Sequence, residues 1–113
     1  MKTNTDFAKF LSRFLSEYLP HERNMSPNTI LSYKDAFVQF ISYMRDVQKI
    51  RVDGLTLDKI TRQVVLEFLA WIQDKRNCSI STRNYRLAAI HSFVQYLQYE
   101  DIIHLEQWQK ILS

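Results

Sequence analysis

Turn-forming residues are scarce in this chain, and that scarcity limits the folds it can adopt. Its 113 residues include one glycine and two prolines. A β-rich fold of this size needs many tight turns, which glycine and proline usually supply. The sequence therefore predicts an all-α protein in which helices are joined by few loops. A chain of this length is expected to bury roughly two thirds of the surface it exposes when unfolded, which is enough for one core.

The spacing of the apolar residues predicts where the helices lie. Apolar side chains recur three and four residues apart in segments 5–19, 26–48, 61–74, 79–97 and 101–112. Pro20 is expected to end the first helix, Ser26 and Thr61 are expected to cap the second and third, and the fourth is expected to begin at Ser79. The fifth segment would form a short helix whose apolar face has no evident partner in the chain. The side chains expected in the core are Phe14, Phe37, Phe40, Phe68, Leu69, Ile90 and Val94.

Charge and cysteine content narrow the class of protein. Lys and Arg total 15 against 12 Asp and Glu, which gives a net charge of +3 and suits an anionic partner. The single Cys78 cannot form an internal disulfide, as expected for a reducing compartment. No apolar run approaches the roughly 20 residues that span a bilayer, and the N-terminus lacks a signal-peptide core. We therefore expect a soluble, cytoplasmic protein with no membrane partner.

The segment 79–97, SISTRNYRLAAIHSFVQYL, places a dense polar group ahead of an apolar stripe. Its first turns hold Ser79, Ser81, Thr82, Arg83, Asn84 and Arg86, and the stripe holds Leu87, Ile90, Val94 and Leu97. A helix N-terminus offers unpaired N–H groups and partial positive charge, so hydroxyls, an amide and guanidiniums placed there suit a polyanion. The pattern predicts contact with DNA. The alternative is an ordinary helix cap with two solvated arginines.

Two motifs taken together resemble a known family. Residues 26–34 read SPNTIxSYK and open a Phe-rich helix, and residues 81–93 read STxNxRLxAIxSF. In this order, they resemble the long helix and the last core helix of the N-terminal core-binding domain of the tyrosine recombinases, the phage-integrase family. The resemblance covers roughly residues 5–99.

The resemblance implies a SAM-like bundle of four main helices with a short fifth C-terminal helix. Such a bundle is one half of a C-shaped clamp around duplex DNA, and the family's catalytic tyrosine, Arg, Lys and His residues belong to a C-terminal domain. We expect residues 1–99 to form the core-binding domain and residues 100–113 to form a C-terminal helix or the start of a linker to a catalytic domain absent from this chain. The chain itself is then no enzyme and has no catalytic residue, whereas its full-length parent is a tyrosine recombinase.

The same resemblance directs the N-terminal parts of the second and fourth helices to the major groove and its phosphates. The candidate DNA-binding residues are Asn28, Thr29, Ser32, Lys34, Ser81, Thr82, Arg83, Asn84 and Arg86. Hydroxyls, backbone N–H groups and lysine hold phosphate oxygens, whereas arginine reads guanine and asparagine reads adenine. Structural roles are the alternative: Thr29 and Ser32 could bond helix carbonyls, Lys34 could pair with an acid, and Asn84 could belong to the cap.

Other chemistry finds little support in the residues. The three histidines lie on different elements without a second ligand nearby, and no glycine-rich loop is present, so we expect no metal and no cofactor. The carboxylates of Glu100 and Asp101 are expected to be solvated at a helix end. The expected partners are double-stranded DNA and other recombinase protomers on the DNA, and the isolated domain is expected to be monomeric. The alternative function is a helical protein-interaction module without DNA binding, with Trp71 and Trp108 as anchors.

Overall fold

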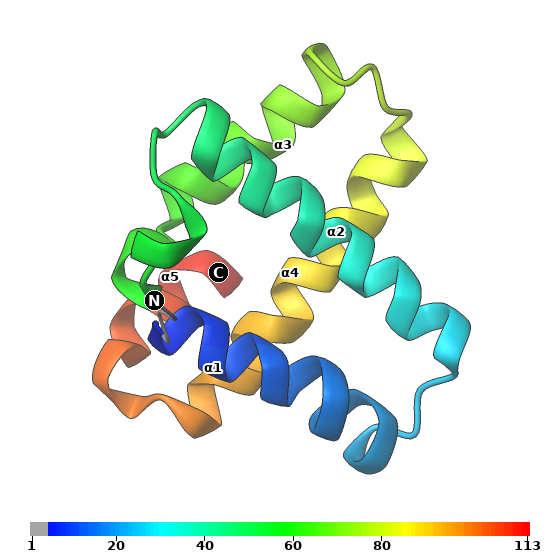
Figure 1. Cartoon of the computed structure of the whole chain (residues 1–113), viewed down its shortest axis with the longest axis vertical. Coiled ribbons are helices and arrows are strands. Elements are labelled where there is room, and N and C mark those ends of the chain that lie inside the picture. The colour runs from blue at the N-terminus through cyan, green and yellow to red at the C-terminus, as the bar shows by residue number, and fades with distance from the viewer. Residues whose placement is uncertain (1–4) are drawn as a thin grey trace. The chain divides into compact units, whose positions relative to one another are not determined.

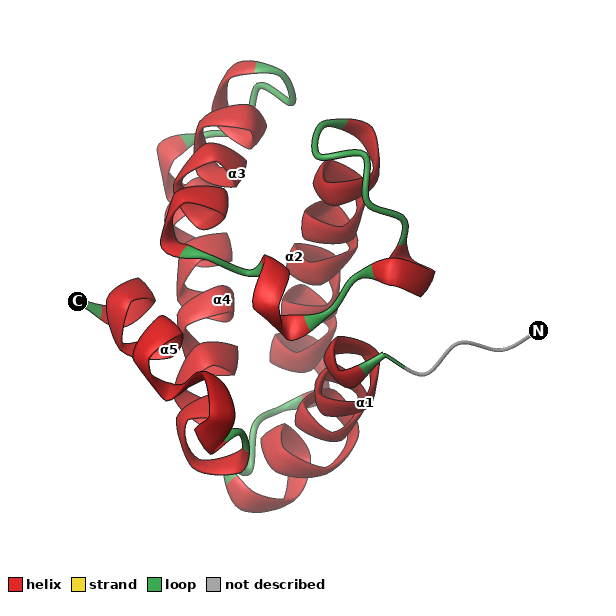
Figure 2. Cartoon of the chain, turned by 90° about the vertical axis from the view of Figure 1, so that its left-hand side faces the viewer, coloured by secondary structure: helices red, strands yellow, loops and turns green. Residues whose placement is uncertain are grey.

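The computed structural model describes residues 5–113, and every regular element in this part of the chain is helical. Figure 2 shows helices and loops without strands over these residues. The all-α prediction is therefore confirmed, with four main helices and a short fifth one. The chain divides into two compact units, the first ending at Thr56 and the second running Leu57–Ser113.

The first unit begins with one continuous helix that changes its winding partway along. The α-helix α1 spans Asp6–Arg13, and the π-helix η1 continues it as Phe14–Glu22. The prediction that Pro20 ends this helix is wrong. At its end, the Arg23 N–H donates to the Tyr18 carbonyl five residues earlier, at 2.9 Å, which is the π-helical pattern. In an α-helix, a proline ring clashes with the carbonyl four residues earlier. The wider π-helical turn changes the distance between this ring and the preceding carbonyls, and the helix continues past Pro20.

The second helix of this unit, α2, spans Pro27–Asp46 and is followed by the 3₁₀ turn η2, Val52–Gly54. The predicted cap is confirmed, because Ser26 precedes the helix and Pro27 occupies its first position, where proline loses no hydrogen bond. The predicted core residues Phe14, Phe37 and Phe40 are all buried. Phe14 meets Phe37 edge-on with ring centroids 6.3 Å apart, so η1 packs on α2 through aromatic rings.

The second unit contains the remaining helices (Figure 1). They are the 3₁₀ turn η3 at Leu57–Lys59, α3 at Arg62–Asp74, α4 at Ile80–Glu100, the 3₁₀ turn η4 at Ile102–His104, and α5 at Leu105–Leu112. Thr61 caps α3 as predicted, and Ser79 caps α4, each side chain accepting from a backbone N–H at 3.1 Å. The predicted core residues Phe68, Leu69, Ile90 and Val94 are buried.

The helix α5 finds its partner within its own unit, packing on α3 and α4. Trp108 is fully buried, and its Nε1 donates to Asp101 Oδ2 at 3.0 Å. His104 Nδ1 lies 2.7 Å from the same oxygen. The expectation of an unpartnered apolar face is therefore wrong, and so is the expectation that Asp101 is solvated. The turn η4 reverses the chain, which brings the tryptophan and the carboxylate together.

A further polar contact fixes α5 against the start of the unit. Gln107 Nε2 donates to the carbonyls of Leu57 and Ile60 at 2.8 and 2.6 Å. Within residues 5–113, no helix is both long enough and apolar enough to cross a bilayer. Gln107 therefore ties α5 to the segment that leads into α3.

Candidate nucleic-acid interface

The first turn of α2 combines a hydroxyl pair with unpaired polar side chains. Ser26 Oγ accepts from the Thr29 N–H at 3.3 Å and lies 3.0 Å from Thr29 Oγ1. The Thr29 hydroxyl is thus part of the cap. Asn28 and Ser32 are exposed, and neither side chain has a hydrogen-bond partner within the described residues. Their donors and acceptors are available to a ligand.

The first turn of α4 repeats this arrangement. Ser79 Oγ accepts from the Thr82 N–H at 3.1 Å and also donates to Thr82 Oγ1 at 3.1 Å. Ser81 is exposed, and Arg83 and Arg86 are half-buried. Both helices therefore begin with the same Ser-x-x-Thr hydroxyl pair.

Acidic residues are missing from both of these helix starts. The first turns of α2, α3 and α4 contain none, whereas those of α1 and α5 contain Asp6 and Glu106. An acid in the first turn normally offsets the partial positive charge of a helix N-terminus. At α2 and α4 that charge is left for an external anion.

Helix geometry divides the candidates on α2 between two faces. Successive residues are about 100° apart around an α-helix, so Asn28, Thr29 and Ser32 fall within one arc of about 100° and Lys34 lies outside it. Tyr33 and Ala36, which are buried, continue the Thr29 side toward the C-terminus. Thr29 therefore lies at the N-terminal end of the face that packs into the core, whereas Asn28 and Ser32 lie beside that face and are exposed.

The candidates on α4 divide in the same way. Thr82, Arg83 and Arg86 share one arc of about 100°, whereas Ser81 and Asn84 lie outside it. Ile90, which is buried, continues the Arg86 side of the helix by one turn. On α4 the buried stripe therefore leads back to a polar N-terminal end whose side chains are half-buried.

The cations of α2 and of the segment that follows it differ in their partners. Arg45 donates to Asp46 at 2.8 Å, and this hydrogen bond raises the pKa of Arg45. Arg51 lies 3.8 Å from Asp53. Lys34 is exposed and has no ion pair within the described residues. The suggested pairing of Lys34 with an acid is therefore not found, and its charge is available to a phosphate.

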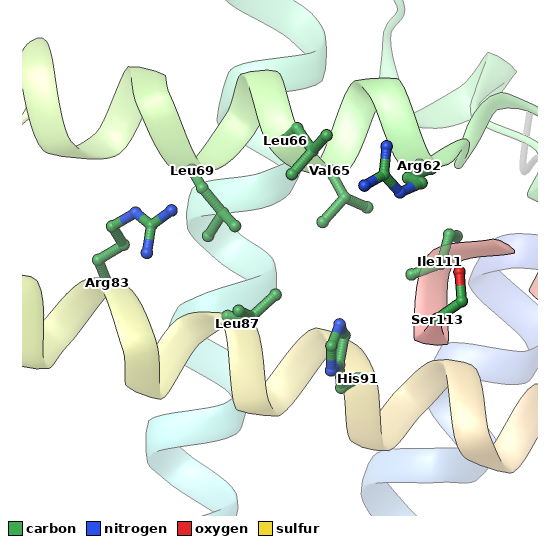
Figure 3. A pocket seen from close by; sticks show the side chains of 9 residues that line it. All are labelled: Arg62, Val65, Leu66, Leu69, Arg83, Leu87, His91, Ile111 and Ser113. Carbon is green, nitrogen blue, oxygen red and sulfur yellow. The ribbon is translucent and has the colours of Figure 1, made fainter.

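The two arginines of α4 have different surroundings. The Arg83 side chain reaches from α4 toward α3 (Figure 3) and lines a groove between these helices. Its Nη1 donates to Asn84 Oδ1 at 3.3 Å. Arg86 is not among the groove residues. Arg83 therefore belongs both to the first turns of α4 and to the groove, whereas Arg86 belongs to the first turns alone.

Two residues of this groove, Arg62 and Leu66, were not expected at a functional surface. Arg62 is the first residue of α3, and the Leu66 side chain remains 43% exposed. The available signal was the position of Leu66, one residue away from the apolar stripe of Val65, Leu69 and Ile72. Among the described residues, no three His, Cys, Asp or Glu side chains come together in a group that could hold a metal ion.

Residues 11–101 match the sequence profile of the family described as phage integrase, N-terminal SAM-like domain. This chain belongs to that family. The SAM-like domain is 31% identical over 113 residues to a Sinorhizobium fredii protein named "Putative integrase/recombinase y4rC", covering 100% of this chain and 34% of that protein. No solved structure matches it significantly.

Tyrosine recombinases are also among the relatives of this SAM-like domain. It is 33% identical over 99 residues to the tyrosine recombinase XerD of Oceanobacillus iheyensis, covering 82% of this chain and 32% of that protein. It is 36% identical over 88 residues to the tyrosine recombinase XerC of Herpetosiphon aurantiacus, covering 78% and 26%. The chain spans about a third or less of the length of these relatives.

Proposed function

We propose that this chain is the DNA-binding module of a site-specific recombinase, which holds duplex DNA through the N-terminal turns of α2 and α4. Cleavage and rejoining of the DNA would belong to a catalytic domain outside this chain. The family and the recombinase relatives support this class of function. The assignment to particular residues rests on the local structure of the two helix starts.

The observation that carries the proposal is the repeated helix start. Two helices of one chain begin with a Ser-x-x-Thr hydroxyl pair, exposed polar neighbours and no acid. Backbone N–H groups and hydroxyls at a helix N-terminus suit a phosphate oxygen. Two such ends would hold the DNA backbone at two places.

The side chains beside the caps supply the remaining contacts. A helix about 10–12 Å across fills a major groove about 12 Å wide, so both of its flanks approach phosphates. Lys34, Ser81 and Asn84, which lie outside the polar arcs, would contact the flanking backbone. Arg86 would contact a base edge, because arginine pairs bidentately with guanine O6 and N7.

Titration against DNA tests the proposal directly. The 113-residue chain is titrated against a labelled duplex carrying the recombination site of its own genetic element, and against a shuffled duplex of equal length. Two cations, Lys34 and Arg83, would neutralise phosphates. With a slope of about −0.9 per contact, affinity should fall roughly 12-fold between about 50 and 200 mM salt.

Single substitutions separate base reading from phosphate holding. Arg86→Ala should weaken binding to the cognate duplex by about 1–3 kcal/mol and binding to the shuffled duplex much less. Arg51→Ala removes the same charge from an exposed position outside the site and serves as the matched control. If the wild-type chain shows no salt-dependent binding to its own site, DNA binding is refuted and the protein-interaction function takes its place.

A further inference from the structure

The connection from α4 to α5 carries an exposed apolar projection. Tyr99, Ile102 and Ile103 are 86%, 75% and 85% exposed, and we name these three residues the isoleucine knob. Single exposed apolar side chains are common on protein surfaces, but three within five residues form a patch of the kind that marks an interaction site. Glu100, beside them, is exposed and forms no ion pair within the described residues.

The groove between α3 and α4 is concave and flanked by arginines, whereas the isoleucine knob projects and has Glu100 beside it. Its volume is about 210 Å³, and its apolar lining includes the buried Val65 and Leu69 and the part-exposed Leu66 and Leu87. Arg62 and Arg83 lie along it, one from each helix (Figure 3). Arg62 is exposed and has no ion pair within residues 5–113. The groove thus offers apolar contact together with an unpaired cation.

We propose that the isoleucine knob of one copy of this chain docks into the α3–α4 groove of a second copy. Ile102 and Ile103 would enter the apolar lining, and Glu100 would pair with Arg62 of the second copy. The knob and the groove are different surfaces, so the contact is head-to-tail and leaves one knob and one groove free in each pair. This goes beyond DNA binding and does not depend on it.

Helix geometry excludes docking of the knob into the groove of its own chain. The groove is lined on α4 by Arg83, Leu87 and His91, whereas the knob begins at Tyr99 and continues past the end of the helix. With 1.5 Å of rise per residue, Leu87 and Ile102 are about 20 Å apart along the helix direction. A rigid α4 keeps them apart, so the occupant has to be another molecule.

The contact is expected to be weak in free solution. A knob of three side chains buries less surface than the roughly 1,200–2,000 Å² of a stable interface. Single copies therefore dominate at low concentration, in keeping with the expected monomeric state of the isolated domain. The contact becomes strong only where two copies are held at high local concentration.

Disulfide trapping tests the contact without DNA. In a Cys78→Ser background, which removes the native thiol, an Ile103→Cys chain is mixed with a Leu66→Cys chain under mild oxidation. Docking should make this pair form a covalent dimer at least about tenfold faster than Leu66→Cys mixed with Val38→Cys. Val38 is a suitable control because it is exposed and apolar and lies outside the knob and the groove.

A charge exchange in the same assay excludes damage to the fold as the explanation. Adding Glu100→Arg to the knob chain, or Arg62→Glu to the groove chain, should slow dimer formation, and combining the two should restore it. Equal rates for the Val38 control, equally fast Ile103–Ile103 dimers, or failure of the exchange to restore the rate would each overturn the proposal. Affinity of the same variants for a single-site duplex is measured separately, so failure of the contact is distinguishable from failure of DNA binding.

Discussion

Replacing Trp108 by phenylalanine tests how α5 is held in its unit. The indole is fully buried, and its Nε1 donates to Asp101 Oδ2 at 3.0 Å. Asp101 is itself only 7% exposed. Trp108→Phe keeps an aromatic ring in the core but removes the donor, so the Asp101 carboxylate retains only its contact with His104.

The expected loss of stability has two parts. A hydrogen bond to a charged group contributes about 1.5–3 kcal/mol, and a buried carboxylate deprived of a donor cannot recover this from water. The smaller ring leaves a cavity that adds about 1 kcal/mol. The free energy of unfolding should therefore fall by about 3 kcal/mol, a large part of the roughly 5–15 kcal/mol that stabilises a domain.

Urea denaturation followed by tryptophan fluorescence measures this loss. The remaining Trp71 lies in the same unit, beneath the Arg76 guanidinium at 4.8 Å, and reports its unfolding. A second series in an Asp101→Asn background completes a double-mutant cycle. Trp108→Phe should cost at least about 1 kcal/mol less there, because the charged acceptor is already gone.

Two results would refute this reasoning. The first is a loss below about 0.5 kcal/mol, which is the range of ordinary surface substitutions. The second is an equal loss in both backgrounds, which would mean that Trp108 stabilises α5 by packing alone and that the hydrogen bond to Asp101 contributes nothing.

The other predictions concern the first unit, the caps, the charges and the chemistry. Phe40→Ala should destabilise the first unit by about 3–5 kcal/mol in urea denaturation followed by far-UV circular dichroism, and a loss under about 1 kcal/mol would place the ring outside the core. Ser79→Ala should cost about 1 kcal/mol and Ser79→Gly only a few tenths, because glycine is a tolerated cap; equal losses would contradict the capping role. Lys34→Ala should make the salt slope less negative by about 0.9 on cognate and shuffled duplexes alike, whereas a loss on the cognate duplex alone would make Lys34 a base reader. Incubation with a suicide DNA substrate followed by denaturing electrophoresis should show no covalent protein–DNA adduct, and a tyrosine-linked adduct would refute the proposed division of labour.

Local rules were sufficient for most of the secondary structure. The helix starts at Ser26, Thr61 and Ser79 depend on a side chain bonding an N–H three residues later, and the structure confirms all three. The buried stripes depend on the 3.6-residue period of a helix, which the apolar spacing records directly. The candidate site was also predictable from short segments, because each polar helix start consists of a few neighbouring residues in the sequence.

Which way each polar side chain of these helix starts points could be worked out only from helix geometry together with the tertiary packing. Arg83 and Arg86 are only three residues apart in the sequence. Even so, Arg83 lines the α3–α4 groove and Arg86 is not among the groove residues. The difference depends on where α3 lies against α4. No residue of α4 encodes that position alone, because the packing also involves Leu66, Leu69 and Ile111.

By itself, the sequence determined the helical class, the capped helix starts, most of the core and the resemblance to the integrase family, because each depends on short-range patterns. Only the tertiary structure decided that the first helix continues through Pro20, that α5 covers its own unit, and that Asp101 is buried beside Trp108. These features join residues through a wider helical turn or a chain reversal, and their free energy comes from contacts that the local pattern does not contain. The burial of a carboxylate shows the reason most clearly: its cost is offset only by the two donors that η4 and α5 bring to it.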